Sequence, residues 1–368
     1  MITPIDNRLQ ESLRNKIDHK TKPLGALGQL EDLALQLGLI QQTLTPTVDR
    51  PALLVFAGDH GIAATGLVNP YPQAVTAQMV LNFIRGGAAI NVFCRVHDID
   101  LRVVDAGVNH AFGEEVLTHP SFYAASVARG TRNYLEGPAM TSGQRQFALD
   151  QGAALVNDLR QSGCNTVGFG EMGIGNSTSA ALILAALTGL SLDVCIGRGT
   201  GATDEQLAVK RDAAARALAL HGPHIAGGAD ALERVGGFEI AMMTGAMLRA
   251  AALRMTILVD GFIAGAALLA ACRIDAAVTG YCVFAHQSHE QGHRHLLAHL
   301  HAKPLLQLDL RLGEGTGAAL AVPLVRTAAA FLCEMASFGD AGVSQATGTD
   351  AGDTLAADRA DKPVEAAS

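Results

Sequence analysis

The feature that most constrains the fold of this 368-residue chain is an alternation of short apolar runs with helix-like stretches. Each run is rich in aliphatic residues and ends next to a glycine or an acidic residue. The runs cover residues 52–57, 101–104, 166–169, 192–196, 256–259 and 305–312. Strands that alternate with helices indicate a mostly parallel sheet with helices on both faces, and largely apolar runs fit strands buried on two sides. We therefore predict an α/β fold of the Rossmann-like kind.

The two ends of the chain differ from this central part. Residues 1–50 have a helical pattern and lead through a proline-containing linker into the first apolar run. Residues 318–338 form a long apolar helical pattern, whereas residues 339–368 are small, polar and acidic, as in disordered tails. We expect an N-terminal helical segment over 1–50, an α/β catalytic domain over 51–317, a C-terminal helix over 318–338 and a disordered tail over 339–368.

Composition limits the function classes. Hydrophobic residues make up 49% of the chain and charged residues 17%, which excludes wholesale disorder. The net charge of −8 repels phosphate backbones, and with no tryptophan there is little surface for stacking bases, so we expect no nucleic-acid partner. We find no signal peptide or continuously apolar span, and the six cysteines form no CxxC pair. We expect a cytoplasmic protein without a membrane partner.

Three glycine-dense loops, at residues 168–177, 197–201 and 313–317, follow predicted strands. Glycine lets backbone amides approach an anion, and the N-terminus of a following helix adds a favourable dipole. In the first loop, Ser177 and Thr178 open such a helix. Tight strand-to-helix turns explain any single loop equally well, but three loops at one sheet edge favour a phosphate site.

The first loop also matches the dinucleotide-binding pattern GxGxxG at Gly168, Gly170 and Gly173, with Asp193 about twenty residues later. The match is weak, because Asp193 begins an apolar run instead of ending one and Glu171 inside the loop would repel a pyrophosphate. A dinucleotide-dependent oxidoreductase nevertheless stays open as an alternative function.

Two carboxylates, Glu171 and Glu314, stand in these glycine loops. A helix that starts after Gly315 favours the ionised form of Glu314, and partial burial favours the neutral form. A carboxylate balanced between these effects suits a general base near neutral pH. A helix cap or an ion pair with Arg311 explains Glu314 equally well, and spacing alone does not decide.

Six histidines lie between residues 286 and 301. The pairs His289/His293 and His295/His299 have the spacing that places two metal ligands on one helix face, and Glu290 is near enough to join them. No cysteine or dense carboxylate cluster completes a ligand shell, so a solvated helix face is the favoured interpretation and we expect no metal.

Seven short motifs together carry a resemblance to a known family. They lie at residues 22–31, 57–61, 170–177, 197–201, 236–239, 259–262 and 311–319. In this combination and order, residues 10–338 resemble the nicotinate-nucleotide–dimethylbenzimidazole phosphoribosyltransferases, which work in assembly of the nucleotide loop of cobalamin.

The resemblance implies a reaction and an architecture. Nicotinate mononucleotide would donate phosphoribose to 5,6-dimethylbenzimidazole or a related base, giving α-ribazole 5′-phosphate and nicotinate without a cofactor. The chain would form a homodimer, with a parallel α/β domain and a small helical domain built from both chain ends.

The resemblance also assigns roles to residues. Glu314 would be the catalytic base, supported by Glu171 and Lys210. The phosphate contacts would come from Gly173, Gly175, Asn176, Ser177, Thr178, Gly197, Arg198, Gly199, Thr200 and Gly201. The base pocket would comprise residues 72–79, which include Gln78 and Met79, together with Leu312 and Gly313. Ser288 would reach into this pocket from a second subunit. Some relatives have glutamine in place of Met79, which leaves the natural acceptor base open.

Overall fold

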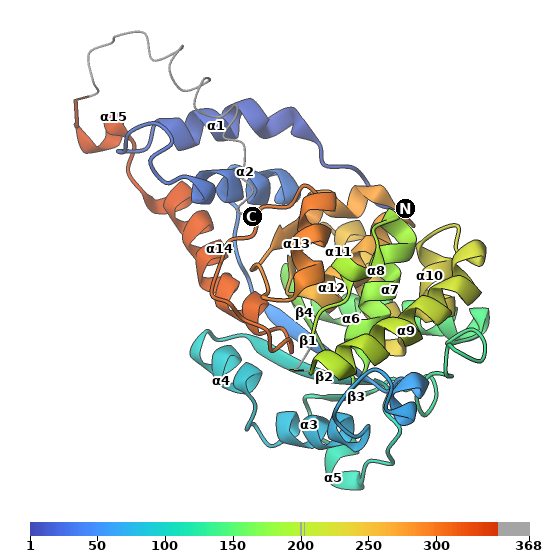
Figure 1. Cartoon of the computed structure of the whole chain (residues 1–368). Coiled ribbons are helices and arrows are strands. Elements are labelled where there is room, and N and C mark those ends of the chain that lie inside the picture. Colours follow the sequence, from blue (N-terminus) through green and yellow to red (C-terminus); the bar gives the residue numbers. More distant parts are fainter. Residues whose placement is uncertain (199–200, 202, 345–368) are drawn as a thin grey trace.

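The computed structural model describes residues 1–198, 201 and 203–344 of the chain. Within this part the centre is a six-stranded parallel sheet in the order β3–β2–β1–β4–β5–β6 (Figure 1). The strands are β1 (Ala52–Gly58), β2 (Asp100–Gly107), β3 (Phe122–Ala124), β4 (Thr166–Met172), β5 (Thr256–Val259) and β6 (Cys282–Phe284). This is the strand order of dinucleotide-binding folds, in which ligands bind beyond the carboxyl ends of the strands where the order reverses, here at β1 and β4.

Alternate side chains of the strands enter two separate apolar cores. Leu54 and Phe56 of β1 belong to one core, and Leu53 and Val55 belong to the other. The helices of the first core are α6 (Ser142–Gln161), α7 (Asn176–Thr188), α9 (Asp204–His221), α10 (Gly228–Val235), α11 (Phe238–Ala252) and α12 (Phe262–Cys272). Those of the second are α1 (Gln10–Asp18), α2 (Gln29–Gln41), α3 (Ala74–Ile84), α4 (Ala89–Val96) and α14 (Thr316–Glu334). The predicted α/β fold with helices on both faces is therefore confirmed.

The remaining helices are short. They are α5 (Glu114–Leu117), α8 (Leu192–Cys195), α13 (Gln291–His299) and α15 (Phe338–Ala341), with 3-10 turns at Asn7–Leu9, Gly61–Thr65, Gly222–His224 and Ala276–Tyr281.

Four of the six predicted strands are present, and two predictions were wrong. Leu192–Cys195 of the run at 192–196 form α8, in which Asp193 faces solvent, a position that a strand buried on both sides does not offer. Residues 305–312 run beside β6 and the residues that follow it. They form an isolated bridge between Leu306 and His286 and a few backbone hydrogen bonds but no strand, and Leu308 and Leu312 are exposed. Because polar residues alternate with the leucines there, the segment stays at the surface of the molecule instead of entering the core.

Helices from both chain ends lie side by side (Figure 1). α1 packs on α2, α2 packs on α14, and Lys20 forms an antiparallel bridge with Ser337. The backbone amide of Thr21 also donates to the carbonyl of Ala336 at 3.1 Å. This arrangement agrees with a small helical unit built from the two ends, although the division into residues 1–50, 51–317 and 318–338 stays a prediction.

The segment predicted as a tail, residues 339–368, begins with helical residues. Ser337 Oγ accepts from the Asp340 amide at 3.1 Å, and the Asp340 carboxylate accepts from the Ser337 amide at 3.2 Å, which makes a capping box for α15. The prediction of disorder was therefore wrong for residues 339–341, where a local cap closes one helical turn. Residues 345–368 lie outside the described residues.

Two stretches of the described chain, residues 74–96 and Thr316–Glu334, are long and apolar enough to cross a membrane by length and composition alone. The first is divided into α3 and α4, and the second is α14, which packs against α2 and β4 as a core helix does. They are weak indications of a membrane span.

Candidate active site

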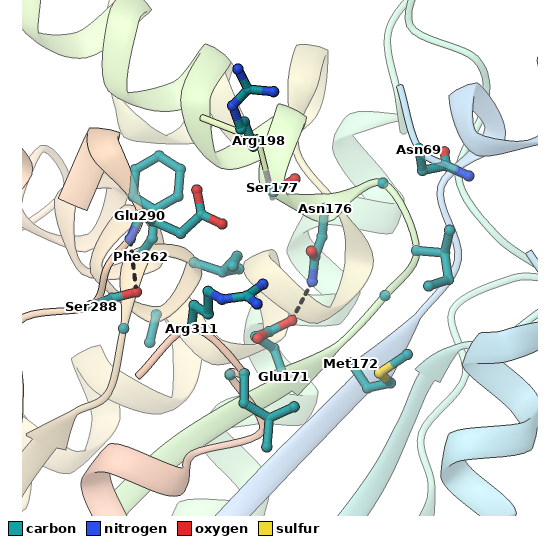
Figure 2. Close-up of a pocket in the computed structure, with 18 of the residues that line it drawn as sticks. Asn69, Glu171, Met172, Asn176, Ser177, Arg198, Phe262, Ser288, Glu290 and Arg311 are labelled. Carbon is teal, nitrogen blue, oxygen red and sulfur yellow. Dashed lines mark hydrogen bonds between the residues drawn. The ribbon is translucent and has the colours of Figure 1, made fainter. Parts of the chain in front are cut away.

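A pocket lies beyond the carboxyl ends of β4 and β5, where the fold predicts a ligand (Figure 2). Glu171 and Met172 from the end of β4 form one wall, and residues 260–264 after β5 form another. Further lining residues come from loops, from the start of α7 and from α9: Asn69, Gly173, Gly175, Asn176, Ser177, Arg198, Lys210, His286, Ser288, Glu290, Arg311, Leu312 and Gly313. In Figure 2 the Arg311 side chain extends into the pocket toward Glu171.

The N-terminus of α7 forms the positively polarised end of this pocket. Gly175 precedes the helix with a φ of 97°, a left-handed conformation that favours glycine. Lys210 Nζ donates to Ser177 Oγ at 3.1 Å and to the carbonyl of Gly197 at 3.3 Å. Lys210 is 3% exposed, and burial lowers the pKa of its ammonium while the charge of Glu290 raises it. A helix N-terminus beside a buried lysine is suited to an anion such as phosphate.

The predicted phosphate residues fall into three groups. Gly173, Gly175, Asn176, Ser177 and Arg198 line the pocket, and Arg198 pairs with Asp204. Thr178 is buried inside α7, and Gly197 lies behind Lys210. Gly201 stands in an exposed turn, while Gly199 and Thr200 lie outside the described residues.

Glu171 is held inside the pocket wall. Its carboxyl accepts a hydrogen bond from the Asn176 side chain, and its other oxygen lies against Gly313. Burial, helped by the charges of Asp260, Glu239 and Glu314, raises the pKa of Glu171 to about 8. The carboxyl is therefore mainly protonated at neutral pH.

Glu314 lies on the other side of Gly313 and is not among the residues that line the pocket. Its φ is 62°, and Gly313 and Gly315 are left-handed as well, each at 84°. Burial raises the pKa of the Glu314 carboxyl to about 7; the charge of Asp260 adds to this, and the backbone amide of Ile90, at the start of α4, opposes it. Glu314 Oε2 has no hydrogen-bond partner among the described residues. Glu314 is not a helix cap, because Gly315 occupies the cap position of α14. It also forms no ion pair with Arg311 within the described chain.

Asp260 fixes the turn that presents Glu314. Its Oδ2 accepts from the Gly315 amide at 3.2 Å, and its Oδ1 accepts from the Ala318 amide at 3.0 Å. Asp260 thus caps the start of α14 from the end of β5, and His286 lies 3.6 Å from the same carboxylate. Sequence reasoning assigned no role to Asp260 or His286; the signal for Asp260 was an acid directly after a buried strand.

The GxGxxG match has a packing role. Gly168 and Gly170 lie within β4 instead of in a loop. A Cβ built on Gly170 would approach the Glu314 carbonyl oxygen to 2.3 Å, and one on Gly168 would approach the Ala318 Cβ to 3.2 Å. These glycines let α14 rest directly on β4, so the interpretation as a dinucleotide signature was wrong.

The predicted base-pocket residues do not share one wall. Leu312, Gly313 and Ser288 line the pocket within a single chain, so a contribution of Ser288 to a second subunit stays a prediction. Met79 is half-buried against the second core. Gln78 is exposed and lines a separate pocket with Asp59, Gln73 and His110.

The histidine-rich segment does not assemble a chelate. His293 is buried, and its Nδ1 accepts from the Ser288 amide at 2.9 Å, while His289 is exposed. Burial lowers the pKa of His293 to about 3. Over the described residues, no group of three or more His, Cys, Asp or Glu side chains is placed to hold a metal ion.

Comparisons with known proteins decide the family. A family model described as Phosphoribosyltransferase matches residues 2–343. The nicotinate-nucleotide–dimethylbenzimidazole phosphoribosyltransferase of Cupriavidus necator is 58% identical over 346 residues, covering 94% of this chain and 98% of that protein. The chain belongs to this phosphoribosyltransferase family.

Other phosphoribosyltransferases agree. The enzyme of the same name from Aromatoleum aromaticum is 56% identical over 338 residues, which covers 92% of this chain and 96% of that protein. A crystal structure of the phosphoribosyltransferase of that name from Thermus thermophilus has a TM-score of 0.86 and 41% identity, covering 92% of this chain and 99% of that one. The resemblance read from the sequence is confirmed, and the alternative of a dinucleotide-dependent oxidoreductase is not supported.

Proposed function

We propose that the chain transfers phosphoribose from nicotinate mononucleotide to 5,6-dimethylbenzimidazole or a related base, giving α-ribazole 5′-phosphate and nicotinate. The observation that carries the proposal is the pocket in which the start of α7 and Lys210 lie beside carboxyl groups whose pKa values are raised. The names of the relatives in Cupriavidus necator and Aromatoleum aromaticum support the choice of substrates.

Phosphate binding belongs to the α7 end of the pocket. The helix N-terminus and the Lys210 ammonium attract the 5′-phosphate, and Ser177 adds a hydroxyl. With the phosphate fixed there, the ribose extends toward Glu171 and Gly313. Orientation of this kind supplies much of the rate enhancement in a group transfer.

The leaving group needs little help. Its glycosidic nitrogen is a pyridinium, so breaking the bond to C1′ moves the electron pair onto nitrogen and neutralises a positive charge. Departure therefore requires no general acid. The protonated Glu171 carboxyl contributes hydrogen bonding and shape at this wall of the pocket without adding negative charge.

The acceptor must lose a proton. As one nitrogen of the benzimidazole attacks C1′, the N–H on its other nitrogen becomes acidic, and the Glu314 carboxylate takes that proton. With a pKa of about 7, Glu314 is partly ionised at neutral pH and can serve as the base. A β donor and an α product require inversion, so a single displacement with oxocarbenium character is sufficient.

Access of the acceptor to Glu314 requires movement near Gly313, because Glu314 lies behind the pocket wall. The exposed Leu312, which lines the pocket, supplies apolar surface for an aromatic base on this side. We further propose that the enzyme is a cytoplasmic homodimer, with Ser288 reaching a second subunit's site; light scattering of the purified protein tests the dimer.

The direct test is an incubation of the protein with nicotinate mononucleotide and a panel of benzimidazoles, purines and phenols. Mass spectrometry and NMR then identify the product and its anomeric configuration. The expected result is nicotinate release coupled to an α-linked ribotide of 5,6-dimethylbenzimidazole. The proposal fails if no acceptor releases nicotinate.

A further inference from the structure

A fully buried carboxylate–imidazole–hydroxyl chain lies directly beneath the α7 end of the pocket. His60 Nε2 lies 2.7 Å from Glu239 Oε1, and His60 Nδ1 lies 3.1 Å from Ser179 Oγ. Each of the three side chains belongs to a residue that is 0% exposed. Both nitrogens of one histidine are therefore bound inside the protein, one to α11 and one to α7.

The order of these groups is that of a Ser–His–acid triad, but a nucleophilic role does not fit the burial. Ser179 lies in the second turn of α7, inside the first core, where no substrate reaches its hydroxyl. A triad also requires an accessible nucleophile and donors for an oxyanion. The chain must therefore serve another purpose.

Burying a carboxylate has a large desolvation penalty, which a compensating contact has to offset. Only one oxygen of Glu239 is bound, because Oε2 has no hydrogen-bond partner within the described residues. Burial alone would lower the pKa of His60. The charge and the hydrogen bond of Glu239 act in the opposite direction, and the pKa of His60 is raised overall. Apolar residues would fill this space without the penalty, so what the pair adds here is its directed contacts.

Three glycines let backbone from three segments approach Glu239. A Cβ on Gly237 would lie 2.4 Å from Glu239 Oε2, and one on Gly58 would lie 2.8 Å from the same atom. A Cβ on Gly173, in the loop before α7, would lie 2.5 Å from the Gly58 carbonyl oxygen and 3.4 Å from Glu239 Oε1. The loop that lines the pocket thus rests on the end of β1 and on the Glu239 carboxylate.

We propose that His60 and Glu239 are positioning residues that fix the phosphate-binding end of α7. Glu239 supports the loop at Gly173, and His60 holds Ser179. Ser177 lies between these two supported positions in the chain and is therefore kept where Lys210 donates to it. Neither positioning residue touches substrate. This inference rests on the proposed function, because it assigns the donor phosphate to this end of the pocket.

The inference predicts a selective kinetic change. Loss of the pair loosens donor binding, whereas the turn at Glu314, on the acceptor side, keeps its supports from Asp260 and β4. A variant that raises KM with kcat unchanged has lost binding that is equal in the ground and transition states.

The test uses Glu239→Gln and the milder Ser179→Ala, which removes the hydroxyl that lies 3.1 Å from His60 Nδ1. We expect Glu239→Gln to raise KM and Kd for nicotinate mononucleotide about tenfold and Ser179→Ala about threefold, equivalent to roughly 1.4 and 0.6 kcal/mol. The expected kcat and acceptor KM stay within about twofold of the parent. Ser179→Ala decides the question if Glu239→Gln does not fold.

A matched control is His221→Gln. His221 is also a buried histidine, but it bonds to the Tyr134 carbonyl at 2.7 Å, at the far end of α9 from Lys210. It should lower the melting temperature without raising donor KM. Calorimetric titration of the parent protein with nicotinate mononucleotide separates two failures. If the parent does not bind this donor, the proposed function fails; if it does and Ser179→Ala and Glu239→Gln bind equally well, the positioning role is rejected.

Discussion

The two carboxylates Glu171 and Glu314 look alike in the sequence and differ in the structure. Both stand in glycine-rich loops, and burial raises the pKa of each. Glu171 belongs to a strand, lines the pocket and is held by Asn176. Glu314 has a left-handed backbone conformation, lies behind Gly313 and leaves one oxygen without a partner in the described chain.

The contacts of the two carboxyl groups, more than their raised pKa values, point to different roles. With a pKa of about 8, the Glu171 carboxyl is mainly protonated at neutral pH. With a pKa of about 7, the Glu314 carboxyl gains or loses its proton near neutral pH. The unpartnered oxygen of Glu314 is free to accept a proton, while both oxygens of Glu171 already have neighbours. Burial alone therefore does not identify a base; the contacts of each oxygen do.

The largest expected effect is that of Glu314→Gln. The amide keeps the shape of the side chain but cannot take the proton, so kcat should fall about 100-fold or more, the usual contribution of a positioned base. Donor Kd, measured by calorimetry, should not change. Steady-state turnover within a few-fold of the parent would remove Glu314 from the role of base.

Lys210→Ala should have the second largest effect, on the donor side. Loss of the buried ammonium should raise KM for nicotinate mononucleotide about tenfold or more, because a charge-assisted contact to phosphate is lost. Lys210→Arg is the matched control, since it keeps the charge and should recover part of the affinity. Equal donor KM values in Lys210→Ala and the parent would place the phosphate elsewhere.

Glu171→Gln should have a smaller effect than either. A protonated carboxyl and an amide are both neutral and similar in shape, so we expect kcat to fall only about fivefold. Glu171→Ala, which removes the contact with Asn176, should be clearly worse. If kcat fell as much for Glu171→Gln as for Glu314→Gln, the negative charge at position 171 would be essential. The two carboxyl groups would then not differ in the way proposed.

The last prediction concerns stability and its pH dependence, not catalysis. The pKa of Glu171 is raised in the folded protein from 4.5 to about 8, so the unfolded chain releases this proton at lower pH than the folded one. The parent should therefore lose stability as pH rises from about 4.5 to 8, by at most roughly 1.4 kcal/mol per pH unit. The Glu171→Gln variant has no titrating group at this position, so it should lose less stability over the same pH range. Urea unfolding at pH 5.5, 6.5 and 7.5 measures this, and parallel curves would contradict it.

Much of the fold was predictable because the signals are local. The runs at 52–57, 101–104, 166–169 and 256–259 became strands, since largely apolar runs suit a sheet covered on both faces. β3 and β6 were missed because three residues give too short a pattern. The prediction of a strand at residues 305–312 was wrong. The leucines there alternate with polar residues, and the course of this segment is set by its contact with the chain after β6.

The site was predictable in its parts but not in its assembly. Glycine loops, Glu171 and Glu314 could be named from motifs, and Lys210 from the family resemblance. The cap that Asp260 gives to α14 joins residues that are 55 positions apart or more, and the contact between His60 and Glu239 joins residues 179 positions apart. Such pairs depend on how the whole sheet is closed by its helices, which no local pattern contains.

The left-handed turn at position 314 has a consequence for how this enzyme could change. A φ of 62° disfavours branched and bulky side chains, and among non-glycine residues it is adopted mainly by asparagine and aspartate. Aspartate would keep both the turn and the acid, yet its shorter arm would leave the carboxylate one methylene away from its present place. The local geometry therefore limits which other acidic side chains a mutation could place at position 314 without changing the backbone.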